Sequence, residues 1–432
     1  MKKSVITISV VCAALTVMSA VSAYAQGIAA HGFGAVNEGM GGAATGAAND
    51  AAGALHWNPG AISALERSEI SFGLGLCLPT LSVYSENPLM AAGTGSSTKG
   101  EPGAVPLPAM ALVKKTPDSC VTWGISMGVI GGSRLSYRGS MDNPILTAPN
   151  PANPLSGYGS LSADIQILQL APTLSFQMTE KFSIGFAPTI TMGNITCDPL
   201  YLVNELGYTD PAGAGTRWAW GAGFQIGAYY DTQCGWAFGV SYKRKQWMED
   251  IRYNTVRTIT AGPGAGTTVM DTLTVGLDYP DIVSFGLSFY GWKGWLFACD
   301  ARYFMYGHTR GFDHLSWSSV WGISAGVQHD CTERLTIRGG YSWNENPIDA
   351  AATRDNVASP LIQQHGVYLG ASYKITCRLT AHLAYSHMFK NSIEGEYFGT
   401  KAGGMGGQIP HGGVVRSTMA ADTVMASFSV GF

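Results

Sequence analysis

The chain has 432 residues, of which 46% are hydrophobic and only 13% are charged. Soluble domains usually carry roughly a quarter of charged residues, so this composition argues against a large water-facing surface. The formal net charge of −3 gives no electrostatic reason to expect a nucleic-acid partner. Beyond the N-terminus there is no apolar run of about 18 residues that would predict a membrane-spanning helix. Low charge together with many aromatic residues and glycines is typical of a transmembrane β-barrel.

The start of the chain has the features of a secretory signal peptide. Two lysines follow the first methionine, residues 6–20 form an apolar stretch, and residues 23–25 read A-Y-A, which is a small-residue cleavage pattern. We therefore expect residues 1–25 to be removed during export and the exported chain to begin at Gln26.

Residues 26–66 form a segment that is rich in Gly and Ala and lacks the alternation of a β-strand. The segment contains Asn58-Pro59-Gly60. Pro59 fixes its own φ and biases Asn58 towards an extended backbone, and the Asn58 amide both donates and accepts hydrogen bonds. We expect a corner that holds the segment to polar groups inside a barrel. An ordinary Asn-Pro turn ahead of the first strand is the alternative.

Residues 67–432 are dominated by a period of two. In residues 120–130, large apolar side chains such as Trp123 and Met127 alternate with small or polar ones. Successive side chains of a strand point to opposite faces, so one face is apolar and the other is small or polar. A soluble β-sandwich would carry more charge on its second face, so the pattern favours a membrane barrel. The same alternation recurs in residues 218–230, 235–243, 283–289 and 295–303.

Turns and loops alternate in length along this part of the chain. Short turns on one side and long loops on the other are the pattern of bacterial outer-membrane barrels, and seven hairpins predict about fourteen strands. A lumen of that width leaks unless something fills it. The long loops lie near residues 79–102, 132–159, 194–214, 255–270, 345–360 and 391–416.

The chain ends in an alternating run whose last residue is Phe432. A final strand that stops on an aromatic residue is similar to the last strand of outer-membrane barrels, and in that class the residue serves as an assembly signal. The resemblance implies recognition by the barrel-assembly machinery and contact with outer-membrane lipid and lipopolysaccharide.

Three runs of residues 26–66 resemble the N-terminal hatch of the FadL/TodX family, which comprises outer-membrane transporters of long-chain fatty acids and other hydrophobic compounds. They are residues 38–44 (EGMGGAA), 48–51 (ANDA) and 57–65 (WNPGAISAL). One departure is that the Asn-Pro-Ala of the family reads Asn-Pro-Gly here. The resemblance implies an all-β barrel with residues 26–66 as a plug and residues 67–432 as the barrel, in the outer membrane of a Gram-negative bacterium.

The resemblance also implies a mechanism of passive uptake without a cofactor. A hydrophobic small molecule is captured by extracellular loops, a movement of the hatch opens the path, and a kink in the third strand allows exit through the wall. Gly124, Gly128, Gly131 and Gly132 make residues 120–132 the candidate for that strand, because Gly weakens strand pairing. The alternative is that lumen-facing Gly is simply common in barrels.

The loops near 79–102 and 194–214 are the candidate capture surface. Apolar side chains in exposed loops suggest a groove for a hydrophobic ligand, and packing of loop against loop is the alternative. The apolar residues are Leu78, Leu81, Leu89, Met90, Leu200 and Leu202.

We predict no catalytic residue and no metal site. Residues 39–44 match one form of the dinucleotide-binding fingerprint, but no strand precedes them. Seven of the eight cysteines lie outside the signal peptide, and we interpret them as free residues, many of them in turns, with disulfides as the alternative. A general diffusion porin and a structural or adhesive surface barrel are the competing functions. The substrate stays open between long-chain fatty acids and aromatic hydrocarbons.

Overall fold

The structure is a computed structural model. It describes residues 26–87, 95–148, 157–198, 207–209, 217–259, 267–313, 315–397 and 412–432.

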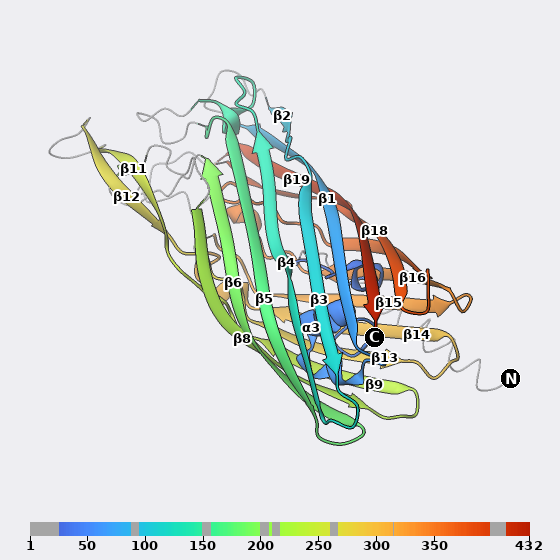
Figure 1. Ribbon diagram of the computed structural model, residues 1–432. Coiled ribbons are helices and arrows are strands. Elements are labelled where there is room, and N and C mark those ends of the chain that lie inside the picture. The colour runs from blue at the N-terminus through green and yellow to red at the C-terminus, as the bar shows by residue number, and fades with distance from the viewer. Residues whose placement is uncertain are drawn as a thin grey trace.

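Within these ranges fourteen antiparallel strands close into a barrel (Figure 1), which confirms the predicted fold class. The first strand pairs with the last, and β8 pairs with β9, so the sheet has no free ends. The strands are β1 (Glu69–Glu86), β3 (Val105–Lys115), β4 (Val121–Tyr137), β5 (Leu161–Gln177), β6 (Phe182–Asp198), β8 (Arg217–Asp231), β9 (Trp236–Lys243), β13 (Ile282–Phe289), β14 (Trp295–Phe304), β15 (Val320–Asp330), β16 (Leu335–Asn344), β17 (His365–Lys374), β18 (Leu379–Glu396) and β19 (Val414–Gly431).

The outer face of β1 shows where the lipid lies. From Ile70 to Leu78 the outward side chains are apolar and 45–55% exposed. The next outward residues are Thr80, Ser82 and Tyr84, which are polar or amphipathic. An apolar stretch of about nine residues is what a tilted strand needs to cross the hydrocarbon of a membrane. The remainder of β1 therefore rises beyond the membrane.

The wall is taller on one side than on the other (Figure 1). Strands β1, β4, β5, β6, β8, β18 and β19 have 15–18 residues, whereas β9 and β13 to β17 have 8–11. On the short side, segments with the 3₁₀-helices η5 (Tyr306–His308) and η6 (Ala350–Ala352) fold inward over the lumen. Their buried side chains form one large core with the upper wall, which includes Phe304, Tyr306, Phe312, Trp317, Ile348, Val357 and Ile362.

The remaining elements lie at the loop end of the barrel. β11 and β12 form a ribbon that projects from the taller side (Figure 1), and β7 pairs with β11. These elements are η4 (Pro144–Leu146), β2 (Ser96–Lys99), β7 (Gly207–Thr209), β10 (Trp247–Met248), β11 (Ile251–Ile259) and β12 (Thr268–Val275).

Four predicted loops begin too early in the sequence. The structure continues β1 to Glu86, β4 to Tyr137, β6 to Asp198 and β18 to Glu396. Above the membrane the outward positions turn polar, so the contrast between the two faces disappears although the backbone pairing continues. The predicted loop at 255–270 likewise includes parts of β11 and β12.

The N-terminal segment, defined here as residues 26–65, lies within the barrel (Figure 1). Helix α2 (Ala35–Gly39) packs against β16 to β19, α3 (Ala51–Trp57) against β1, β3 and β4, and η2 (Pro59–Ala64) against β4, β5, β6, β8 and β9. The small residues of the segment make this possible. A Cβ at Gly46 would lie 2.5 Å from the carbonyl carbon of Gly286 in β13, so only Gly lets the two backbones approach so closely.

No helix in the described part of the chain is both long enough and apolar enough to cross a membrane.

No disulfide joins the seven cysteines outside the predicted signal peptide, all of which lie in the described ranges. Cys120, Cys234, Cys331 and Cys377 lie exposed between paired strands at the short-turn end of the barrel.

Candidate functional site

The Asn58 corner is fully buried, and each polar atom of its amide has a partner. Its Nδ2 donates to the carbonyl oxygens of Thr45 (2.8 Å) and Ala228 in β8 (3.0 Å), and its Oδ1 accepts from the Gly60 amide (3.0 Å). The backbone at Asn58 is extended, as Pro59 requires. One side chain thus joins two parts of the N-terminal segment to the wall.

Gly60 explains the departure from the Asn-Pro-Ala of the family. A Cβ at this position would lie 2.9 Å from the Gly227 carbonyl oxygen of β8. The Gly60 carbonyl also accepts hydrogen bonds from the hydroxyls of Ser183 (2.8 Å) and Ser175 (3.2 Å). The wall approaches the corner too closely for a methyl group.

A buried ion pair on β14 holds the same region from the other side. Asp300 Oδ2 and Arg302 Nη2 are 2.5 Å apart, and both side chains are almost fully buried. Asp300 Oδ2 accepts from the amides of Ala44 (2.9 Å) and Thr45 (2.8 Å), and Arg302 donates to the Gly42 carbonyl (2.6 Å). The backbone of the N-terminal segment thus supplies partners to both charged groups, while Asp300 Oδ1 and Arg302 Nε stay without a hydrogen-bond partner among the described residues.

Arg302 also stacks on the indole of Trp57, with its guanidinium carbon 3.5 Å from the ring centre. A cation over an indole face is attracted by the ring quadrupole, most strongly where water is excluded. The Trp57 carbonyl accepts from Ser241 Oγ (2.5 Å) and Gln225 Nε2 (3.0 Å), so β8 and β9 add further anchors.

The N-terminus of α3 meets two carboxylates. Asp50 caps the helix by accepting from the Gly53 amide (3.2 Å), and Glu69 of β1 accepts from the Ala51 amide (3.2 Å). Burial, followed by the nearby charge of Glu69, raises the pKa of Asp50 to about 7. A narrow pocket with room for about one water molecule lies here, and its polar lining residues are Asp50, Glu69, Ser71, His382, Ser427 and Ser429.

The wall has a gap beside β4, the third strand of the barrel. β3 pairs with β4 only as far as Gly128, and the register of β4 with β5 shifts between Val129 and Gly131. Above the gap, the Glu101 amide donates to the Ser136 carbonyl (2.7 Å). The edge of β4 between these points has no partner strand from the barrel.

Residues 28–30 of the N-terminal segment fill that gap. The Ala30 amide donates to the Ile130 carbonyl (2.9 Å), and the Gly132 amide donates to the Ile28 carbonyl (3.0 Å). Ala29 and Gly131 form an antiparallel bridge. A Cβ at Gly131 would lie 2.6 Å from the Ile28 oxygen, so glycine allows this close contact.

The four glycines predicted to mark a lateral opening all lie on β4. Gly131 and Gly132 lie directly at the register shift. Gly124 and Gly128 lie lower and make room for the N-terminal segment, because their Cβ positions would fall 2.9 Å from Leu55 and 2.7 Å from Phe33, respectively.

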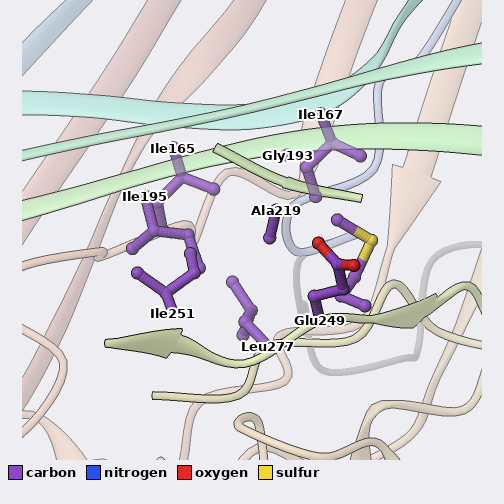
Figure 2. Close-up of a pocket in the computed structure, with 9 residues that line it drawn as sticks. Ile165, Ile167, Gly193, Ile195, Ala219, Glu249, Ile251 and Leu277 are labelled. Atoms are coloured by element: carbon purple, nitrogen blue, oxygen red, sulfur yellow. The ribbon is translucent and has the colours of Figure 1, made fainter. Parts of the chain in front are cut away.

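An apolar pocket borders the gap on the lumen side (Figure 2). Ile167 pairs with Gly131 and Ile165 pairs with Ser133, so two pocket residues lie directly beside the register shift. The side chains nearly fill the pocket, which has room for about one water molecule, and Glu249 is its one charged lining residue. It is lined by Ile165, Ile167, Gly193, Ile195, Ala219, Met248, Glu249, Ile251 and Leu277.

Sequence reasoning missed this pocket, although part of its signal is present. Ile165 and Ile167 lie on the same face of β5 as Ala163 and Gln169. That face points into the lumen, where small or polar residues are expected. Such an inversion of the barrel pattern marks an apolar site. Met248 and Leu277 lie far from β5 in the sequence, and only folding brings them next to it.

Among the described residues, no group of three or more His, Cys, Asp or Glu side chains could hold a metal ion.

The sequence model of the outer membrane protein transport protein family (OMPP1/FadL/TodX) matches residues 16–403. The chain belongs to this family. Family and fold together place it in the outer membrane of a Gram-negative bacterium. A comparison with curated proteins gave no match.

Solved structures of this family share the fold over nearly the whole chain. The P. putida toluene transporter TodX is 17% identical, with 93% of this chain and 99% of TodX covered at a TM-score of 0.70. A Pseudomonas aeruginosa FadL homologue is 16% identical, with 94% and 100% covered at 0.70. The Ralstonia pickettii toluene transporter TbuX is 14% identical, with 93% and 99% covered at 0.67. Sequence identities this low show that the fold is shared, but they do not show a shared substrate or mechanism.

The structure corrects one part of the predicted capture surface of this FadL/TodX-family barrel. Leu78 and Leu81 belong to β1 and not to a loop; Leu78 faces the lipid, and Leu81 is buried. The mistake has the same cause as the early loop boundary, because β1 continues to Glu86 beyond the point where its two faces stop contrasting. Four predicted capture residues lie outside the described residues: Leu89, Met90, Leu200 and Leu202.

The terminal Phe432 lies at the outer surface, 52% exposed. Its amide donates to the Ser68 carbonyl (3.0 Å), and the Lys114 amine lies 4.8 Å from its ring centre. Its role as an assembly signal stays a prediction.

Proposed function

We propose that this outer-membrane barrel is a passive channel for neutral hydrophobic small molecules, with monoaromatic hydrocarbons as its first substrate class. The observation that carries the proposal is the position of the apolar pocket, which adjoins the gap beside β4. A ligand in this pocket lies next to an interruption of the wall.

The pocket lining favours an uncharged ligand. Its side chains are almost entirely aliphatic, and Glu249 would repel the carboxylate of a fatty acid. The pocket has room for about one water molecule, so even a single ring can bind only when the aliphatic side chains move apart, and a long chain needs a larger displacement. Structurally similar proteins support this choice, because TodX and TbuX are toluene transporters and CymD is a monoaromatic hydrocarbon channel.

In this proposal the N-terminal segment is the hatch. Residues 28–30 leave the β4 edge while the Asn58 corner stays anchored, and the ligand moves from the pocket past Gly131 into the bilayer. The strand pairing supports a lipid-facing exit. Gly73 of β1 pairs with Ala109, which pairs with Gly128, and the apolar belt of β1 continues five residues beyond Gly73 to Leu78.

Ligand capture in this proposal begins at the loop end. The β11–β12 ribbon supplies Ile251 to the pocket and exposes Val269 and Met270. Exposed apolar side chains that continue into a pocket suit a hydrophobic ligand. The loop residues Leu89, Met90, Leu200 and Leu202 stay part of the proposed capture surface.

The filled lumen argues against a general diffusion porin. Such a porin has a water-filled channel, whereas here the N-terminal segment and the inward-folding segments occupy the interior. A purely structural barrel gives no reason for an inward-facing aliphatic pocket in β5 and β6.

Filling the pocket tests the proposal. Ile195→Trp in β6 places an indole in the pocket, and Ile190→Trp on the same strand points its indole to the lipid. We expect uptake of labelled toluene by cells that lack their own channel to fall about tenfold in the first variant, as for a loss of about 1.4 kcal/mol in binding. The second variant should transport like the unmodified protein.

Equal toluene uptake by the two variants, with both folded in the outer membrane, would contradict the pocket as part of the path. Labelled oleate should enter more slowly than toluene. Faster uptake of oleate would reject the preference for neutral ligands.

A further inference from the structure

Gln26, the residue that follows the predicted cleavage site, lies deep in the lumen. It is 4% exposed, and its carbonyl accepts a hydrogen bond from the hydroxyl of Tyr306 (2.8 Å). The next residue packs equally tightly, because a Cβ at Gly27 would lie 2.7 Å from Tyr306 and 2.8 Å from Trp317. The rings of Tyr306, Phe312 and Trp317 contact one another around this point.

Two polar groups of Gln26 are poorly accommodated in this apolar site. The side-chain Nε2 is buried and has no hydrogen-bond partner in the described structure. Cleavage after residue 25 would add an α-amino group at the same place, and no acidic side chain in the described ranges hydrogen-bonds to Gln26. Burial of an unpaired ammonium is strongly unfavourable. Burial instead favours the uncharged amine, which is the nucleophilic form of the group.

We propose that Gln26 is a modification site, at which the N-terminus freed by cleavage cyclises to pyroglutamate. The α-amino nitrogen attacks the side-chain Cδ, and a lactam C–N bond forms. The Cδ–Nε2 bond breaks, a proton passes from the α-nitrogen to Nε2, and ammonia leaves. The reaction consumes only atoms of the chain itself and needs no oxidant or co-substrate.

This single step removes both unfavourable groups. The departing nitrogen is the unpartnered Nε2, and the remaining lactam is neutral. The Gln26 carbonyl is retained, so the hydrogen bond from Tyr306 persists. The modification leaves an uncharged end next to residues 28–30, which fill the gap beside β4. The inference rests on the predicted cleavage site and is independent of the transported substrate.

Mass spectrometry of the protein purified from outer membranes tests the proposal. Chymotrypsin cuts after Phe33, and the resulting peptide of residues 26–33 should weigh one ammonia less than the unmodified sequence. A synthetic peptide of the same sequence, taken through the same preparation, measures cyclisation that arises during handling. We expect the lactam to predominate in the protein and the free amine to predominate in the synthetic peptide.

The variant Gln26→Ala is the matched control, because alanine cannot cyclise and its peptide must show a free α-amine. A free amine on Gln26 in the unmodified protein would overturn the proposal. Cyclisation no greater than that of the synthetic peptide, or a mature chain that begins at another residue, would overturn it as well.

Discussion

The N-terminal segment meets the barrel wall in two different ways. Around Asn58, the segment is bound by polar groups of the wall and by the buried ion pair of Asp300 and Arg302. At residues 28–30 the contact with β4 consists of two backbone hydrogen bonds, and the Ala29 amide adds a long one to Tyr306 (3.3 Å).

The two regions therefore differ in how easily they separate from the wall. A net hydrogen bond contributes about 1 kcal/mol, and burial of the Ile28 side chain, which is 2% exposed, adds roughly 1.5–3 kcal/mol. Breaking a buried ion pair costs about 3–5 kcal/mol by itself, before the hydrogen bonds of the Asn58 corner are counted. One end of the segment is held by charged and polar side chains, and the other is held by backbone hydrogen bonds and apolar packing.

The largest effect is expected at the anchor. Asp300→Ala leaves Arg302 buried without its partner and frees the amides of Ala44 and Thr45, so we expect a loss of about 3–5 kcal/mol of stability. The thermal midpoint of the purified barrel should fall, and its conductance in planar bilayers should rise. The partly exposed pair Arg134–Asp164 is the control, and Arg134→Met should cost about 1 kcal/mol.

If both substitutions lowered the midpoint equally, the ion pair on β14 would not be an anchor.

A smaller loss is expected from Asn58→Ala. The substitution leaves the carbonyls of Thr45 and Ala228 and the amide of Gly60 without partners, and each unsatisfied buried group costs about 1–3 kcal/mol before relaxation. We expect a midpoint between those of the unmodified protein and Asp300→Ala, together with faster hydrogen exchange at Gly60.

Asn346 serves as the comparison, because its side chain accepts one local hydrogen bond from Ile348 and is only partly buried. An Asn58→Ala barrel as stable as Asn346→Ala would show that the corner does not hold the segment.

The last effect is a pH dependence at α3. The pKa of Asp50 is raised to about 7 in the folded chain, so folding takes up a proton between the ordinary value of 3.8 and 7. The contribution of the protonated group to stability is complete below pH 4 and is lost as the pH rises through about 7. Between pH 5 and pH 8 the loss corresponds to about two pKa units, on the order of 2–3 kcal/mol.

Thermal midpoints at pH 5 and pH 8 measure this dependence. Asp50→Asn carries no charge at either pH. It should therefore reduce the difference between the thermal midpoints at pH 5 and pH 8. A midpoint difference that is unchanged in Asp50→Asn would assign the dependence to other groups.

The barrel could be predicted from the sequence because lipid imposes a strict period of two, visible even in β1 from Ile70 to Leu78. The Asn58 corner was recognisable because Pro59 restricts its backbone locally. The true end of β1 was not, since strand pairing persists at Thr80 and beyond without any contrast between the faces.

The pocket and the closed gap lay beyond sequence reasoning for another reason. Residues 28–30 show no strand pattern and form their contact with Gly131 only because the wall lacks a partner strand there. Met248 and Leu277 reach Ile165 through connections that no local pattern specifies. Such sites are properties of the folded chain.

The central claim is that residues 28–30 must leave the β4 edge for a ligand to pass. Gly131 permits this contact, because a Cβ there would lie 2.6 Å from the Ile28 oxygen. The direct measurement is therefore toluene uptake by Gly131→Ala, whose methyl group displaces residues 28–30 from the β4 edge. Gly339→Ala in β16 is the control, because a Cβ at that position meets no atom closer than 3.8 Å. We predict faster uptake by Gly131→Ala and unchanged uptake by Gly339→Ala. Uptake by Gly131→Ala that is no faster, with residues 28–30 shown to have left the edge, would contradict the account.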